Sequence, residues 1–168
     1  MPELTEALFQ VMKRVDGAKF NGHLTSSSSV NTKEKAPYRV LHARRPSFLV
    51  AGDTIITRGG EVVILMDHPD EYEWATSFKA VYAINKLSWN RQTKIIDPVS
   101  KSEKNGPVVN LGTLYVNFDS AEELSIFGFS DTGYRFITGQ NVLVGDMVGG
   151  YTVKRVVDSL GVKLVFVA

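Results

Sequence analysis

The chain has 168 residues, and its 19 basic and 18 acidic side chains leave a formal net charge of +1. This balance argues against a dedicated nucleic-acid-binding protein, which usually carries a basic excess on one face. The absence of cysteine excludes disulfides, zinc–thiolate sites and thiol nucleophiles. The length predicts one domain, and an apolar share of 43% is sufficient for a hydrophobic core.

Residues 3–15 predict an amphipathic helix. Acidic residues begin the segment, basic residues end it, and this order complements the helix dipole. Its apolar residues recur at helical spacing: Leu4, Leu8, Val11, Met12 and Val15. The acidic start lacks the features of a signal peptide, and no apolar run approaches the ~20 residues of a membrane span. We therefore expect synthesis in the cytoplasm and no membrane partner.

Residues 16–37 predict a flexible arm. A run of four serines from Ser26 to Ser29 precedes a polar, charged stretch that contains little to bury. The expected domain organisation is therefore an N-terminal helix and flexible arm over 1–37, followed by a β-barrel domain over 38–168.

Short segments rich in Val, Ile, Tyr and Phe dominate after Tyr38, and Gly- and Pro-containing turns separate them. This pattern predicts a mainly β fold, a small antiparallel barrel or sandwich. The strands are expected at 38–41, 48–50, 54–57, 61–66, 77–85, 94–97, 112–117, 135–138, 152–158 and 162–167. Helical turns are expected at 70–77 and 119–123, and the polar stretch 100–106 predicts an exposed loop.

Residues 49–63 and 143–153 share nearly the same sequence pattern: an apolar pair, Gly-Asp, a short apolar strand, Gly-Gly and a Val-rich strand. Glycine supplies the positive φ angles of tight turns, and aspartate accepts backbone hydrogen bonds within them. We therefore assign structural turn roles, with no chemistry, to Gly52, Asp53, Gly59, Gly60, Gly145, Asp146, Gly149 and Gly150.

Reactive side chains are scarce. A metal site is conceivable at His42, Asp67, His68 and Asp70, but their spacing fits a polar turn better than a ligand set. No serine lies in a nucleophile elbow, and no glycine pair is followed by the helix of a phosphate-binding loop. We expect no catalytic residue, no metal and no cofactor.

Two basic stretches favour a minor alternative, a nucleic-acid-binding module. Arg44 and Arg45 form one of them, and the other places Trp89 between Lys86 and Arg91, as a groove for single strands does. The interpretation we favour is a strand with a buried Trp89 and solvated basic side chains, because the near-zero net charge provides no general field for phosphates.

The stretch from about Tyr38 to Ala168 resembles the head-closure proteins of tailed bacteriophages, which are small β-barrel stopper or head–tail connector proteins. The resemblance covers about three quarters of the chain. It is carried by residues 43–55, 58–62, 65–69, 112–119, 136–140, 144–148, 153–156 and 160–162.

Members of that family form rings under the portal and adaptor, seal the DNA-filled head and dock the tail. The resemblance therefore implies a homo-oligomeric ring in the neck of a virion, with portal or adaptor proteins, tail proteins and passing DNA as partners. It implies no catalytic residue. Candidate contacts with DNA or the channel are Lys101, Lys104, Arg44 and Arg45. The alternative is a tail completion or tail-terminator subunit.

Overall fold

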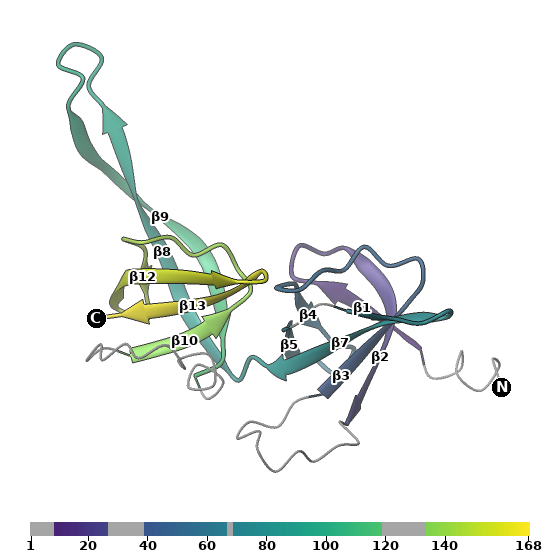
Figure 1. Ribbon diagram of the computed structural model, residues 1–168. Coiled ribbons are helices and arrows are strands. Elements are labelled where there is room, and N and C mark those ends of the chain that lie inside the picture. The colour runs from purple at the N-terminus through teal and green to yellow at the C-terminus, as the bar shows by residue number, and fades with distance from the viewer. Residues whose placement is uncertain (1–8, 27–38, 67–68, 119–133) are drawn as a thin grey trace.

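The computed structural model describes residues 9–26, 39–66, 69–118 and 134–168, and these residues form strands and turns without a helix. The strands build two antiparallel β-barrels that lie side by side, and a long hairpin projects from the second (Figure 1). The mainly β class and the antiparallel barrel are thus confirmed. In the described part of the chain, no helical segment has the length and hydropathy to cross a bilayer.

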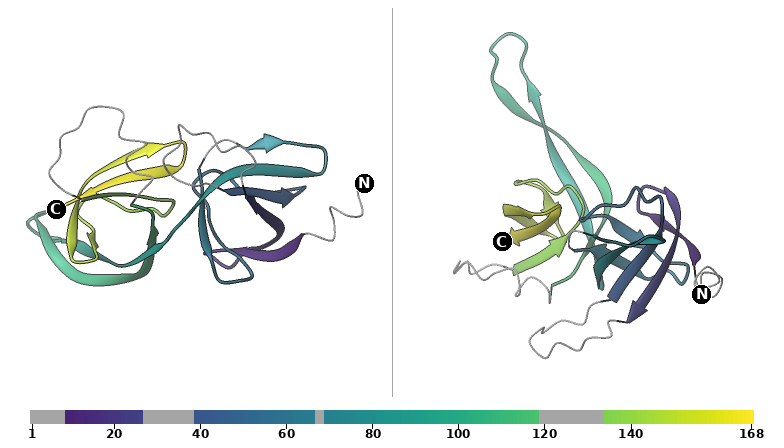
Figure 2. Two further views of the ribbon diagram at one scale, coloured as in Figure 1. Left: turned by 90° about the horizontal axis from the view of Figure 1, so that it is seen from below. Right: turned by 45° about the vertical axis from the view of Figure 1, so that its right-hand side comes forward.

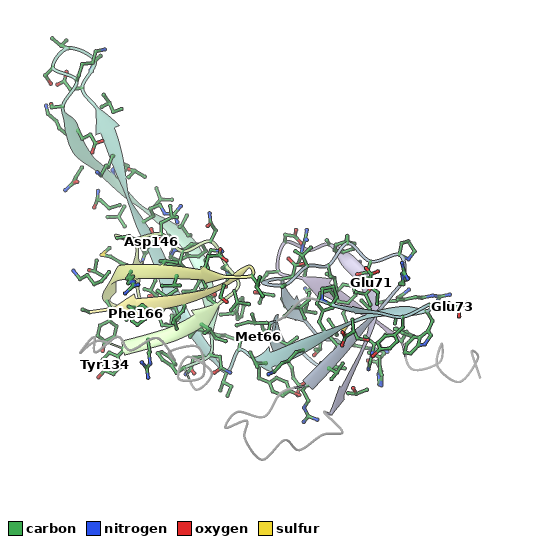
Figure 3. The ribbon with its side chains drawn as sticks, in the orientation of Figure 1. Met66, Glu71, Glu73, Tyr134, Asp146 and Phe166 are labelled. Atoms are coloured by element: carbon green, nitrogen blue, oxygen red, sulfur yellow. The ribbon has the colours of Figure 1, made fainter. Side chains whose placement is uncertain are left out.

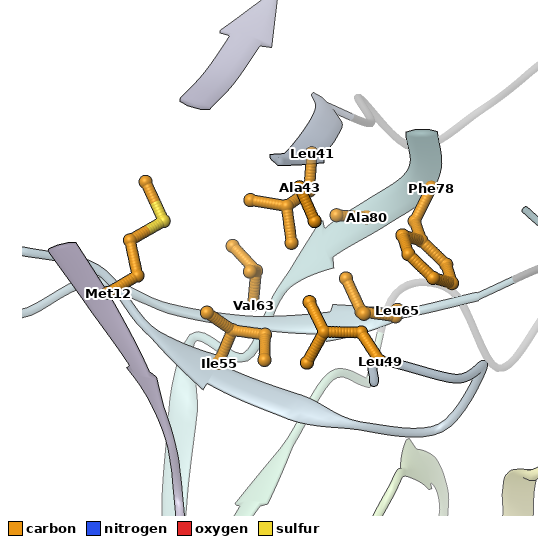
Figure 4. Packing of buried hydrophobic residues seen from close by; sticks show 9 residues of the cluster. All are labelled: Met12, Leu41, Ala43, Leu49, Ile55, Val63, Leu65, Phe78 and Ala80. Carbon is orange, nitrogen blue, oxygen red and sulfur yellow. The ribbon is translucent and has the colours of Figure 1, made fainter. Parts of the chain in front are cut away.

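The first barrel is closed. Its strands are β1 (Gln10–Arg14), β2 (Lys19–Ser26), β3 (Arg39–Arg44), β4 (Thr54–Ile56), β5 (Val62–Leu65) and β7 (Ala75–Tyr82). They follow the order β3-β2-β1-β4-β5-β7, and β3 also pairs with β7, so the sheet has no edge along this ring. The short β6 (Asp70–Glu71) pairs with β7 outside it. Figure 4 shows the side chains that fill the barrel, which are Met12, Leu41, Ala43, Leu49, Ile55, Val63, Leu65, Phe78 and Ala80.

The second barrel contains β8 (Asn85–Ile96), β9 (Glu103–Val116), β10 (Tyr134–Thr138), β11 (Met147–Val148), β12 (Tyr151–Ser159) and β13 (Val162–Val167). Their order is β10-β13-β12-β11-β8-β9. The two edge strands meet at one bridge, in which Asn117 and Ile137 exchange backbone hydrogen bonds of 3.0 and 2.9 Å. The Gln140 side chain extends this seam, because it accepts from the Tyr115 N–H and donates to the Thr113 carbonyl. Side-chain bonds therefore take the place of a longer ladder.

The two barrels have the same connectivity. We number the six strands of each barrel in chain order, so that β7 is the sixth strand of the first barrel. Around both barrels the neighbours then follow the order third, second, first, fourth, fifth, sixth, and the sixth strand again meets the third. β1 thus corresponds to β8 and β4 to β11, while β6 is an addition to the first barrel. The Gly-Asp turn comes immediately before the fourth strand in both. The repeated sequence pattern therefore lies at equivalent positions of two barrels with the same strand connectivity.

A shared apolar layer joins the two barrels. It is formed by Val62, Ile64, Val81, Ala83, Ile137, Val162, Leu164 and Phe166. Strands β5 and β13 each contribute side chains to two cores. Along each strand, alternate residues point into the strand's own barrel and into this layer. Met66 also packs against the layer, and Figure 3 shows its label between the barrels. Only Ala83 and Ile84 separate β7 from β8.

Three glycines let the backbones of the two barrels touch. A Cβ on Gly52 of the first barrel would overlap the carbonyl of Gly161, in the β12–β13 turn of the second. A Cβ on Gly139, just after β10, would overlap the carbonyl of Gly52. Gly52 also has a φ of +91°, which side chains with a Cβ rarely adopt. Both the turn and the inter-barrel contact therefore require glycine at position 52.

The β8–β9 hairpin extends well past the second barrel (Figures 1 and 2). β11 pairs with β8 only at Trp89 and Asn90. Beyond these residues, the described part of the chain gives β8 no strand neighbour except β9. The tip is a turn in which the Asp97 carboxylate accepts hydrogen bonds from the backbone N–H groups of Val99 and Ser100.

Several expectations for the N-terminal region and the loops are wrong. Gln10–Arg14 is strand β1 instead of the end of a helix, and Met12 points into the barrel while Val11 is exposed. Lys19–Ser26 in the expected arm is strand β2, paired with β1 and β3, so position 37 does not separate an arm from a barrel. Residues 1–8 and 27–38 lie outside the described residues.

The expected helical turn at 70–77 is also wrong, because it contains β6 and the start of β7. The turn expected at 119–123 lies outside the described residues. The stretch 100–106 is exposed except for Gly106, which is half-buried, but only its first three residues belong to the hairpin tip, since β9 begins at Glu103. An exposed strand pair therefore replaces much of the predicted loop.

We expect Gly52→Ala and Gly145→Ala to have unequal effects on stability. Both glycines have positive φ, at +91° and +93°, so each substitution should cost about 1–2 kcal/mol in backbone strain. Only Gly52 also faces a backbone overlap, which should raise its cost above about 3 kcal/mol. Chemical denaturation of both variants measures the difference, and equal losses would contradict the proposed contact between the barrels.

Candidate functional site

A buried aspartate fixes the root of the projecting hairpin. Asp146 is 1% exposed and lies in the turn before β11, and Figure 3 labels it in the second barrel. Its carboxylate accepts 2.7 and 2.8 Å hydrogen bonds from the Arg91 guanidinium and one of 2.8 Å from Trp89 Nε1. A fourth hydrogen bond comes from the Leu143 N–H at 3.0 Å. Trp89 and Arg91 belong to β8, whereas Asp146 lies in the turn before β11. These hydrogen bonds therefore join the base of the hairpin to that turn.

The environment of Asp146 keeps its carboxylate ionised. Burial opposes ionisation, but the hydrogen bonds from Arg91, Leu143 and Trp89 outweigh it and hold the pKa below its ordinary value of 3.8. The same carboxylate raises the pKa of Arg91, which also stacks against the Trp89 ring. Every carboxylate oxygen therefore faces a donor of the chain itself, and the group is suited to a structural role.

The equivalent aspartate of the first barrel is held less strongly. Asp53 accepts a 3.0 Å hydrogen bond from the Val50 N–H, as Asp146 does from Leu143. Its ion pair with Arg14 is longer, at 3.6 Å, and Arg14 also binds Asp16. Both aspartates thus cap their own turns, but only Asp146 also binds the root of a projecting element.

The remaining predicted turn glycines lie where the β-turns need them. Gly60 has a φ of +85° in the β4–β5 turn, and Gly59 precedes it. Gly149 and Gly150 both have positive φ in the β11–β12 turn, at +57° and +90°. This pair of angles is that of a two-residue hairpin, which explains a Gly-Gly sequence there.

The basic residues do not form one surface. Arg44 and Arg45 lie at the end of β3 in the first barrel, whereas Lys101 and Lys104 lie at the far end of the hairpin (Figures 1 and 2). Arg45 donates to the Tyr72 carbonyl, and Lys104 pairs with Asp97.

The second basic stretch is also engaged within the chain. Lys86 lies over the Tyr115 ring, while Trp89 and Arg91 bind Asp146. The buried position expected for Trp89 is therefore confirmed, and this aromatic ring is not free to stack on a nucleic-acid base.

The two strands of the hairpin, which we call its shaft, carry ion pairs and exposed apolar side chains. Lys94 pairs with Glu103 at 2.7 Å and Lys104 with Asp97 at 3.3 Å. Val99 at the tip is 90% exposed. Other exposed apolar residues follow along both strands, namely Ile95, Ile96, Val108, Val109 and Leu111. Such a surface is unusual on a monomer and is typical of a contact with another chain.

His42 is held by neighbouring strands. Its Nδ1 lies 2.6 Å from the Ser77 hydroxyl, and its Nε2 lies 3.4 Å from that of Thr25. Partial burial and the nearby His23 lower its pKa. Asp67 and His68 lie outside the described residues, and elsewhere in the described ranges no three His, Asp or Glu side chains converge as a metal site requires.

Comparisons with known proteins give no further assignment. A scan against models of protein families, a search of curated proteins and a search of solved structures each find no match.

The sequence did not reveal the hairpin or its root. β8 and β9 mix charged, polar and apolar residues on both faces. The expected strands were therefore the separate segments 94–97 and 112–117 and a stretch around Trp89, and they were not joined into one hairpin. One signal was the placement of Trp89 and Arg91 at alternate positions of an extended segment, which puts both on one face of a strand. Asn105-Gly106-Pro107 lies in a β-rich context, but its residue types are also typical of the end of a loop.

Replacing Asp146 by Asn should destabilise the second barrel by about 2–4 kcal/mol, because it leaves Arg91 and Trp89 with an imperfect partner in a buried site. Asp53→Asn, with its longer ion pair, serves as the matched control and should cost about 1 kcal/mol or less. Urea denaturation of both variants gives the two free energies. Equal losses would show that the root network adds nothing beyond the cap of its turn.

The difference in stability between the wild type and Asp146→Asn should depend on pH. Because folding lowers the pKa of Asp146, its contribution is complete above the unfolded value of 3.8 and is lost as the pH falls through the folded value. The difference should therefore stay constant between about pH 7 and pH 5 and shrink below about pH 4. Denaturation across this range tests it, and a difference that grows in acid would contradict the direction of the pKa shift.

Proposed function

We propose that this protein is a structural subunit of a virion neck, which assembles into a ring that closes the DNA-filled head of a tailed phage and joins it to the tail. The observation that carries the proposal is the projecting β8–β9 hairpin, an arm with exposed apolar side chains on a pair of barrels locked to each other. Its phage context is supported by the sequence resemblance to head-closure proteins. Its partners would be further copies of itself, portal or adaptor proteins and tail proteins.

The properties of the arm fit an assembly subunit. A two-stranded ribbon is marginally stable in water, and its exposed edges are templates for pairing with another chain. Here the ribbon is fixed at its root by Asp146 and extends away from both barrels. A rigid base with a protruding apolar arm is what a subunit needs to reach its neighbour in a ring.

The same features disfavour a nucleic-acid-binding module. Trp89 and Arg91 bind Asp146, and the ion pairs of the hairpin neutralise Lys94 and Lys104. Binding of single strands requires a basic groove with exposed aromatic rings. DNA passing through a channel, by contrast, requires a wall that does not retain phosphates, and a near-neutral subunit suits that requirement.

A stop codon in this gene, in a phage that carries it, distinguishes the neck from the tail alternative. Loss of a head-closure subunit should yield normal tails that accumulate separately from heads, and heads that lose their packaged DNA. Loss of a tail terminator should instead leave tails of irregular length. Electron microscopy of the lysate, with a nuclease-protection assay of head DNA, separates these outcomes. Normal infectious particles would refute both.

A further inference from the structure

We propose that the free edge of β8 pairs with the β8 edge of a second copy of this chain, antiparallel and centred on Thr93, so that the purified protein is a twofold dimer. This pairing names a partner for the projecting hairpin. It rests on the proposed assembly role of that arm but not on the phage neck, and it is tested with the isolated protein.

The edge of β8 is open over its outer half. β11 covers this edge only at Trp89 and Asn90, and the strand continues to Ile96. From Arg91 to Ile96, the described part of the chain provides β9 on one side and no strand on the other. The segment contains no proline, no glycine and no extra residue, so it is a regular row of backbone donors and acceptors.

The outer edge of β9 is a poor template by comparison. Pro107 lacks an N–H group, so β9 has one backbone donor fewer than a regular strand. The ladder also shifts register twice, and the extra residues lie on β9, where Gly106 and Pro107 oppose the single Thr93 and Leu111 has no counterpart. The irregularity is fixed in place, because the Thr93 hydroxyl donates to the Pro107 carbonyl at 2.7 Å. Bulges and proline are the features by which proteins protect a sheet edge, and here they protect only one.

The charges of the shaft favour a second copy as the partner. Arg91, Lys94 and Lys104 each pair with a carboxylate of the same chain, at Asp146, Glu103 and Asp97. These ion pairs weaken the field that the shaft presents to a strongly acidic or basic partner. What it offers is backbone hydrogen bonding and apolar contact through residues such as Ile95 and Ile96, and an identical ribbon is complementary to both.

Two registers are centred in the open stretch from Arg91 to Ile96, one on Thr93 and one on Lys94, and the charges select between them. In an antiparallel pair about a twofold axis, one residue lies opposite its own copy. Centring the pair on Lys94 would place two lysines opposite each other, which is destabilising. Centring it on Thr93 instead places Arg91 opposite Ile95 and Gln92 opposite Lys94, so that no like charges meet. Such a contact closes at two copies, so it belongs to the free protein. A ring with one face to the head and the other to the tail would be built through a different, head-to-tail interface on the barrels.

The absence of cysteine makes this register directly testable by cross-linking. Residues directly opposite in an antiparallel pair have Cα atoms about 4.5–5.5 Å apart, within the range of a disulfide. Thr93→Cys should therefore form a covalent dimer in the purified full chain under oxidising conditions. Val109→Cys is the matched control, because Val109 is exposed on the same ribbon but on β9, the outer strand of the paired ribbons.

Two further variants check the register. Gln92→Cys and Lys94→Cys should each remain un-cross-linked alone, since their own copies would lie more than about 7 Å apart, but a mixture of the two should form a heterodimer. Sedimentation of the wild type should give the mass of a dimer. The inference is overturned if Thr93→Cys remains monomeric, or if Val109→Cys cross-links as readily. Neither result depends on the phage experiment, so failure of the pairing and failure of the neck assignment are distinguishable.

Discussion

The apolar layer between the barrels is the contact on which the rest of the structure depends. Each barrel contains only about half of the chain, and domains of that size bury a smaller fraction of their surface than larger domains do. β5 and β13 contribute side chains both to their own barrels and to the shared layer. Separating the barrels would expose Ile64, Leu164 and Phe166 together, so we expect the two halves to fold as one cooperative unit.

The two barrels share one connectivity but differ in role. The first two strands are 5 and 8 residues long in the first barrel, whereas the corresponding β8 and β9 have 12 and 14 residues and form the projecting hairpin. The aspartate before the fourth strand follows the same division, because Asp53 only caps its turn and meets Arg14 at 3.6 Å, while Asp146 also receives Arg91 and Trp89. Both barrels thus share the cap of this turn, and only the second has an anchor where the chain projects.

The sequence predicted those elements in which local pattern and tertiary environment agree. The strand at 162–167 is observed at Val162–Val167, and 54–57 differs by one residue from β4. The N-terminal helix failed because Leu8, Val11, Met12 and Val15 fit a helical period, whereas pairing with β2 and β4 determines the structure. The sequence predicts strands at Val62–Leu65 and Leu164–Val167. It does not show that each strand is buried on both faces, between its own barrel and the layer shared with a second barrel. The hydrogen bonds at the root of the hairpin could not be predicted from the sequence, because Arg91 and Asp146 are 55 residues apart.

The two-residue connection between β7 and β8 has a mechanical consequence. β7 belongs to the first barrel and β8 forms one side of the arm, so a pull on the hairpin is transmitted along the covalent backbone directly into the first barrel. The backbones of the two barrels come so close at Gly52, Gly139 and Gly161 that a Cβ there would overlap a carbonyl of the other barrel, which restricts their relative movement. The arm therefore acts as a lever on a stiff body, and torque applied at its tip turns the whole subunit instead of bending it between the barrels.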